Sequence, residues 1–84
     1  MFDKKTLEDG SEYTGFEEKG VRTMFGMRKY PSTGNVYYGE WRINAKNGYG
    51  VLENKKSGYT YAGSWKEDKR NGFGRETTLS SVYE

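Results

Sequence analysis

Side chains that commonly perform acid–base or metal chemistry are scarce in this sequence of 84 residues. It contains no histidine and no cysteine, which removes the commonest general base, the thiolate nucleophile and the usual transition-metal ligands. Carboxylates form adjacent pairs at 17–18 and 67–68, in expected turns where solvation is their simplest role. Lys69 occupies a ligand position in a calcium-like loop at 67–72. The sequence therefore predicts no catalytic residue, no metal site and no cofactor.

Glycine-rich motifs do not indicate nucleotide chemistry either. The Gly-x-Gly pairs at 48–50 and 72–74 are followed by Glu53 and Thr77, where a dinucleotide-binding fingerprint needs a third glycine. No glycine-rich loop ends in Gly-Lys-Ser or Gly-Lys-Thr. A binding or structural protein is therefore favoured over an enzyme.

Aromatic rings must supply most of any core that this chain forms. Leu, Ile, Val and Phe number only 12, whereas Tyr, Phe and Trp together number 14, and the net charge is +2. No apolar run is long enough to span a membrane, and the first residues lack the features of a secretory signal or a transit peptide. We expect a soluble, intracellular chain with a ring-based core.

A repeat of 24 residues organises the sequence. It predicts three copies at 10–33, 34–57 and 58–81, after a lead-in at 1–9 and before a tail at 82–84. Eleven of the twelve glycines fall on this lattice, and so do three tyrosines, two tryptophans and a Phe/Tyr/Phe column. These aromatic columns are Tyr13, Tyr37 and Tyr61; Trp41 and Trp65; and Phe25, Tyr49 and Phe73.

Each copy has the pattern of a β-hairpin. Residues 37–42 alternate between two faces, 43–48 have turn composition ending in Asn-Gly, and 49–53 form a return strand. Three hairpins in series predict an all-β antiparallel meander of about six strands. Gly39 leaves a ring-sized slot beside Tyr37 and Trp41, and we expect the Tyr49 and Phe73 column to supply the rings that cover such glycines.

Two copies closely resemble the MORN repeat. The matching segments are Tyr37-Tyr-Gly-Glu-Trp with Lys46-Asn-Gly-Tyr-Gly-Val, and Tyr61-Ala-Gly-Ser-Trp with Lys69-Arg-Asn-Gly-Phe-Gly. The first copy is degenerate, with Glu17 in place of Trp and Met24 in place of Gly. The resemblance implies an elongated, single-layer antiparallel sheet. It also implies a non-catalytic scaffold that binds helical partner segments, is associated with cilia or membrane–cytoskeleton junctions, or binds acidic phospholipids.

The aromatic columns suggest a partner-binding groove, although packing in the core is the commoner role for rings in strands. Open strand edges and the small size of the array favour association with other protein chains in a complex. The predicted groove residues are Tyr37, Trp41, Tyr49, Tyr61, Trp65 and Phe73.

Basic residues are concentrated between positions 21 and 75, which carry 11 basic and 4 acidic groups. Solvated turns are the commoner explanation, but such an excess also suits acidic phospholipids, whereas nucleic acid ranks last because no recognised module is present. The predicted basic surface comprises Lys46, Lys55, Lys56, Lys69 and Arg70, with Lys55 and Lys56 at the opposite turns from the other three.

These observations lead to one functional hypothesis and two alternatives. The first is a MORN-type scaffold that binds partner proteins within a larger assembly, associated with the cytoskeleton or a cilium. The second is a peripheral membrane adaptor that binds acidic phospholipids through its basic face. A carbohydrate- or choline-binding repeat is disfavoured by the Gly-Tyr-Gly and Gly-Phe-Gly motifs and by the absence of a signal peptide.

Overall fold

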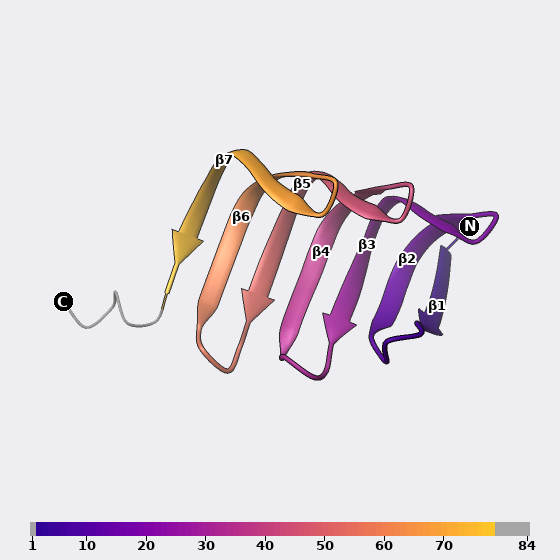
Figure 1. Cartoon of the computed structure of the whole chain (residues 1–84), viewed down its shortest axis with the longest axis horizontal. Helices are drawn as coiled ribbons and strands as arrows, with labels where there is room; N and C mark the ends of the chain where they lie inside the picture. Colours follow the sequence, from indigo (N-terminus) through magenta and orange to yellow (C-terminus); the bar gives the residue numbers. More distant parts are fainter. Residues whose placement is uncertain (1, 79–84) are drawn as a thin grey trace.

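The computed structural model describes residues 2–78 and contains only β-strands and turns (Figure 1). The end of the third predicted copy and the predicted tail at 82–84 lie outside the described residues. The strands are β1 (Phe2–Thr6), β2 (Glu12–Glu18), β3 (Val21–Tyr30), β4 (Asn35–Arg42), β5 (Ala45–Asn54), β6 (Tyr59–Lys66) and β7 (Lys69–Thr77).

The seven strands form one open antiparallel sheet in which every strand pairs with its neighbours in sequence. The molecule measures 48 × 27 × 17 Å, so the sheet is an elongated single layer. The three expected hairpins correspond to β2–β3, β4–β5 and β6–β7. The predicted all-β antiparallel meander is therefore confirmed.

An additional strand, β1, lies in the segment that the sequence predicted to be a lead-in, so the expected count of six strands was one short. It pairs with β2 from Phe2 opposite Phe16 to Thr6 opposite Glu12. Lys5 Nζ lies 2.7 Å from the carboxylate of the buried Glu17. In the other two copies a Trp occupies the position of Glu17. In the first copy the ion pair between Glu17 and Lys5 of β1 takes the place of that buried ring.

The hairpin turns are shorter than the sequence predicted. Residues 43–44 form a two-residue turn with φ of 48° and 65°, which is typical of a type I′ hairpin. Asn47-Gly48, predicted to belong to this turn, lies inside β5. The turn is held by the preceding hairpin, because the Asn44 N–H donates to the Arg22 carbonyl (3.0 Å) and Asn44 Oδ1 accepts from the Arg22 N–H (2.8 Å).

A bulge follows each of these turns on the return strand. Gly48 has φ of 93° and Gly72 of 76°, and the β4–β5 register shifts between Gly39 and Trp41. Met24 occupies the same position in the first copy and adopts φ of 63°, a conformation that side chains other than glycine adopt at a cost. Glycine therefore recurs at this position because the backbone adopts a positive φ there.

The core is a row of edge-to-face rings that runs across the strands. Trp41 lies between Tyr13 and Tyr37, with centroids 5.5 and 5.2 Å away, and Trp65 lies between Tyr37 and Tyr61, with both centroids 5.3 Å away. All five rings are buried. Each Trp Nε1–H and each Tyr hydroxyl of this row donates to a backbone carbonyl, so burial leaves these polar atoms satisfied.

The rings that cover the strand glycines come from the tyrosine column, and the prediction that Tyr49 and Phe73 supply them was wrong. The Tyr37 ring lies against Gly50, where an added Cβ would overlap the ring and its hydroxyl. Tyr49 is the neighbour of Gly50 in the strand and therefore points to the opposite face. The same alternation separates Phe73 from Gly74, which Tyr61 covers.

Candidate functional site

The two faces of the sheet carry different kinds of aromatic side chain. The ladder face holds the buried ring row, Tyr13, Tyr37, Trp41, Tyr61 and Trp65. The phenylalanine face is the opposite side, where the strand alternation places Phe2, Phe16, Phe25, Tyr49 and Phe73.

The six residues of the predicted groove do not form a single surface. Four of them, Tyr37, Trp41, Tyr61 and Trp65, lie on the ladder face with at most 6% of their surface exposed. The other two are on the phenylalanine face and are highly exposed, Tyr49 at 58% and Phe73 at 92%. The structure therefore gives the first four a packing role and leaves the last two available for contacts with a partner.

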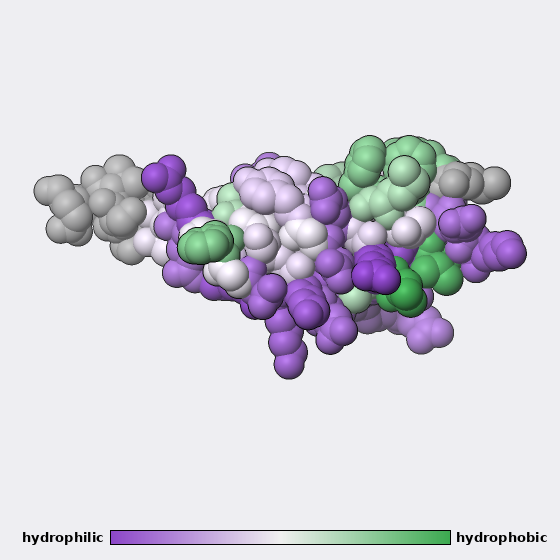
Figure 2. Space-filling model, turned by 90° about the horizontal axis from the view of Figure 1, so that it is seen from above, coloured by the Kyte–Doolittle hydropathy of each residue, from purple (hydrophilic) through white to green (hydrophobic). Residues whose placement is uncertain are grey.

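The phenylalanine face carries a cluster of rings near the N-terminal end of the sheet. Phe16 stacks edge-to-face with Phe2 and Phe25, at centroid distances of 5.5 and 5.2 Å. Figure 2 shows apolar side chains gathered toward the N-terminal end of the molecule, with a further one near the C-terminal end. A second row across the strands on this face, defined by the strand register, comprises Met27, Tyr38, Val51 and Ala62.

Three cations spaced 24 residues apart lie over the rings of the ladder face. The Arg22 guanidinium is 5.1 Å from the Trp41 centroid, and Arg70 is 4.7 Å from that of Tyr61. Between them, Lys46 Nζ lies 5.4 Å from the Tyr37 centroid and 5.7 Å from that of Trp65. These distances suit cation–π attraction. The column follows the 24-residue period, so its spacing is visible in the sequence.

The predicted basic residues are divided between the two sets of turns, as their spacing suggested. Lys46, Lys69 and Arg70 follow the turns at 43–44 and 67–68, whereas Lys55 and Lys56 lie at the turn between β5 and β6. The Lys46 side chain is only 13% exposed, and Arg70 forms an ion pair with Glu76. The structure thus separates these five residues and leaves Lys46 with little accessible charge.

Successive hairpins meet at two equivalent joints. At each joint a Trp Nε1–H donates to a glycine carbonyl of the preceding hairpin, at 3.1 Å in the first and 3.2 Å in the second. The turn residue beyond each Trp caps the backbone of the preceding cation. The first joint consists of Arg22, Gly26, Trp41 and Asn44, and the second of Lys46, Gly50, Trp65 and Asp68.

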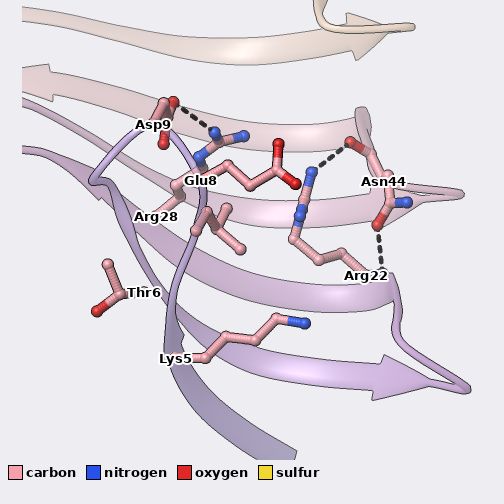
Figure 3. A pocket seen from close by; sticks show the side chains of 8 residues that line it. Lys5, Thr6, Glu8, Asp9, Arg22, Arg28 and Asn44 are labelled. Carbon is pink, nitrogen blue, oxygen red and sulfur yellow. Dashed lines mark hydrogen bonds and ion pairs between the residues drawn. The ribbon is translucent and has the colours of Figure 1, made fainter.

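A polar cavity of about 610 Å³ opens beside the first joint (Figure 3). Its walls are the end of β1, the turn that follows β1, two arginines of β3 and the Asn44 turn. Arg28 is fixed there by Asp9 and by Ser11 Oγ, each 2.9 Å from a guanidinium nitrogen. Lys5, Arg22 and Arg28 extend into the same space, and Glu8 points toward it. The full lining is Lys5, Thr6, Leu7, Glu8, Asp9, Arg22, Arg28 and Asn44.

Burial and charge shift several pKa values around the first joint. Burial, followed by the positive charge of Arg28, lowers the pKa of Arg22. Burial raises the pKa of Tyr13 to about 12, while the nearby Arg22 cation acts in the opposite direction. Burial also raises the pKa of Tyr37, and Glu40 adds to this rise. The rings therefore strongly favour their neutral form, whereas Arg22 carries its charge at a cost.

Residues 2–78 lack two features that would indicate another kind of site. No group of three or more carboxylates gathers in a way that could hold a metal ion. None of the described residues belongs to a helix with the length and apolar character needed to cross a membrane.

Comparison with known families identifies the repeating unit. The family model of the MORN repeat matches residues 37–59 and 61–78. The first predicted copy, 10–33, lies outside both matched ranges. No curated protein matches the chain.

Proposed function

Because the chain belongs to the MORN-repeat family, we propose that it is a non-catalytic scaffold that binds a partner protein through its phenylalanine face. MORN repeats are structural units generally associated with protein or membrane interactions. Of these two kinds of partner, a protein is proposed here, with the phenylalanine face as its binding surface.

The observation that carries this proposal is the exposure of large rings along that face. Phe73 is 92% exposed, Tyr49 58% and Phe25 55%. Soluble proteins rarely expose large apolar side chains together unless another surface covers them, and aromatic residues are enriched in the centres of protein interfaces. A flat, single-layer sheet offers these rings no second layer of its own.

One carboxylate on the same face counts against an anionic membrane. Glu40 lies in the aromatic row between Phe25 and Tyr49, where its carboxylate accepts from the Tyr49 N–H at 3.2 Å. A membrane rich in acidic lipid would repel this carboxylate. The membrane alternative is supported mainly by the exposed Lys55 and Lys56, which lie in a turn.

The test compares a variant of the face with a variant of the turn. The full chain, its Tyr49→Ser/Phe73→Ser variant and the control Lys55→Ser/Lys56→Ser would each be cross-linked to their partners in cells and quantified by mass spectrometry. We expect the ring variant to lose the partners that the wild type and the control retain, with unfolding curves unchanged. Equal recovery by all three chains would contradict the proposal.

A membrane assay separates the alternative function. Flotation with vesicles of phosphatidylserine and phosphatidylcholine would be measured at low and high salt. Salt-sensitive flotation that is lost in the Lys55→Ser/Lys56→Ser variant and kept in the ring variant would instead support the lipid adaptor.

A further inference from the structure

The two joints have the same backbone geometry but different charge. The Asn44 N–H donates to the Arg22 carbonyl at 3.0 Å, and the Asp68 N–H donates to the Lys46 carbonyl at the same distance. In return, the side-chain oxygens of Asn44 and Asp68 accept from the N–H of Arg22 and Lys46, at 2.8 and 2.9 Å. The first joint is therefore capped by an amide side chain and the second by a carboxylate.

This substitution leaves Arg22 without a carboxylate in its own capping residue. Lys46 Nζ lies 3.9 Å from Asp68, whereas Arg22 makes no ion pair with any residue in the range 2–78. The two other cations of the cavity are already neutralised, Lys5 by Glu17 and Arg28 by Asp9. Arg22 is therefore the one cation lining this cavity that has no ion-pair partner among the described residues.

The Arg22 guanidinium is also held rigidly. It lies over the Trp41 and Tyr13 rings, and Nη2 donates to the Asn44 carbonyl at 3.0 Å. Its Nε is buried and finds no hydrogen-bond partner among the described residues. A guanidinium has five N–H donors, so most of its hydrogen-bonding capacity remains unused. A fixed planar donor group suits the geometry of a carboxylate.

From this geometry we propose that the cavity beside the first joint binds a single carboxylate, presented by an acidic side chain of a protein segment, with the Arg22 guanidinium as its counter-ion. This site goes beyond the scaffold function proposed above, because it lies on the ladder face and does not involve the exposed phenylalanines. Its ligand supplies the charge that Asp68 supplies at the second joint.

The surroundings favour one carboxylate over a phosphate group or a lipid surface. A phosphate dianion would need a second uncompensated cation, and both Lys5 and Arg28 are paired. Residues 5–9 form one side of the cavity, and the first 20 residues of the sequence carry six acidic and three basic groups. That local excess of negative charge would repel an anionic bilayer, with its many charges, more strongly than a single acidic side chain.

The experiment follows the Arg22 side-chain and backbone amide signals of the full chain by ¹⁵N NMR during titrations. The probe is a blocked five-residue peptide with one central Glu, and its matched control is the same peptide with Gln. We expect saturable shifts centred on Arg22 and Asn44, with Kd at least about tenfold lower for the Glu peptide, because charge-assisted hydrogen bonds are the stronger kind.

Two matched variants test the mechanism within the same fold. Asn44→Asp keeps the backbone cap and adds an internal carboxylate, so we expect it to weaken binding of the Glu peptide by about tenfold. Asp68→Asn makes the reverse change at the second joint. Because the Asp68 charge also acts on Arg22, this variant should alter binding of the Glu peptide slightly, and far less than Asn44→Asp does. Glu8→Gln removes a competing carboxylate from the cavity and should strengthen binding about two- to threefold.

Four results would overturn the inference. These are no saturable shift at Arg22, equal affinity for the Glu and Gln peptides, undiminished binding by Asn44→Asp, or tighter binding of inorganic phosphate or phosphatidylserine vesicles at the same signals. Since the Tyr49→Ser/Phe73→Ser variant leaves this cavity intact, it should bind the Glu peptide normally. Failure of the carboxylate site is thereby distinguished from failure of the scaffold proposal.

Discussion

At the first joint the turn residue is Asn44 and the cation is Arg22, whereas the second joint uses Asp68 and Lys46. The hydrogen bonds that hold the two turns differ by no more than 0.1 Å in length, and the two tryptophans bond to equivalent glycine carbonyls. The joints differ in electrostatics, because the capping residue of Lys46 is a carboxylate that lies 3.9 Å from its Nζ, whereas the capping residue of Arg22 is an amide.

The two joints show which feature of the repeat is constant, the backbone cap, and which can vary, the charge of the capping side chain. Any side chain with an oxygen at the right position can cap the preceding backbone, so both Asn and Asp satisfy the fold. The charge of that side chain is free to change without moving the strands. Differences in charge between structurally equal joints are therefore where a MORN array can acquire a binding preference.

Removing a joint tryptophan should have the largest effect. We expect Trp41→Ala and Trp65→Ala each to lower the free energy of unfolding by about 3–5 kcal/mol, because a buried ring and its hydrogen bond are lost. Urea unfolding followed by circular dichroism measures this. The control Phe73→Ala removes an exposed ring and should change stability by less than about 0.5 kcal/mol. A clear difference between the two tryptophan variants would contradict the equivalence of the joints, and a loss as small as that of the control would contradict the packing role of the rings.

Adding one methyl group at the glycine of a joint should have the next largest effect. A Cβ at Gly26 would overlap the Tyr13 ring, and one at Gly50 would overlap the Tyr37 ring. We expect Gly26→Ala and Gly50→Ala to destabilise the fold by about 1–3 kcal/mol each, since neither ring can move out of the packed row. Thermal unfolding would show whether the two costs match. Unchanged midpoints would exclude the close ring–backbone packing.

Titration to high pH should reveal the difference in charge between the two joints. The pKa of Tyr13 is raised in the folded chain to about 12 from 10.0, so its contribution to stability is complete below pH 10 and is lost as the pH rises through 12. The Arg22 cation favours the Tyr13 phenolate, so Tyr13 should ionise before Tyr37. Ultraviolet absorbance of Tyr13→Phe and Tyr37→Phe variants, combined with circular dichroism, would establish this order. Reversed order would contradict it.

Exchanging the turn residues should have the smallest effect on stability. Asn44→Asp gives the first joint a counter-charge and should stabilise the fold by about 0.5 kcal/mol, whereas Asp68→Asn should cost a similar amount. Both effects should shrink in high salt because the groups are partly exposed. Chemical unfolding at two salt concentrations provides the measurement. Effects of the same sign in both variants would show that capping, not charge, dominates.

The sequence was sufficient to predict the parts of the fold that repeat. The columns of Tyr37, Trp41 and their equivalents at a spacing of 24 correctly predicted the hairpin meander, because a strand side chain and its repeat must occupy equivalent environments. The turn was misplaced because Asn47-Gly48 is a strong local hairpin signal. The decisive contact, from Asn44 to Arg22, joins residues 22 positions apart and cannot be recognised from local composition.

The candidate sites were less predictable than the fold. Alternation alone would have placed Tyr49 and Phe73 on the face opposite Tyr37, but the groove hypothesis grouped rings by repeat column instead of by strand parity. The unpaired charge of Arg22 depends on which acids reach which cations in three dimensions. The ion pair between Lys5 and Glu17 requires β1, a strand that breaks the repeat and therefore left no periodic signal.

The strictly sequential strand order has a consequence for kinetics. Every pairing in the sheet closes a short loop, so the chain has low contact order for an all-β protein and should fold quickly. Either outer strand can also detach without disturbing pairings elsewhere. Amide hydrogen exchange should consequently be fastest in the outermost strands and slowest near β4, because the ends of the array open first.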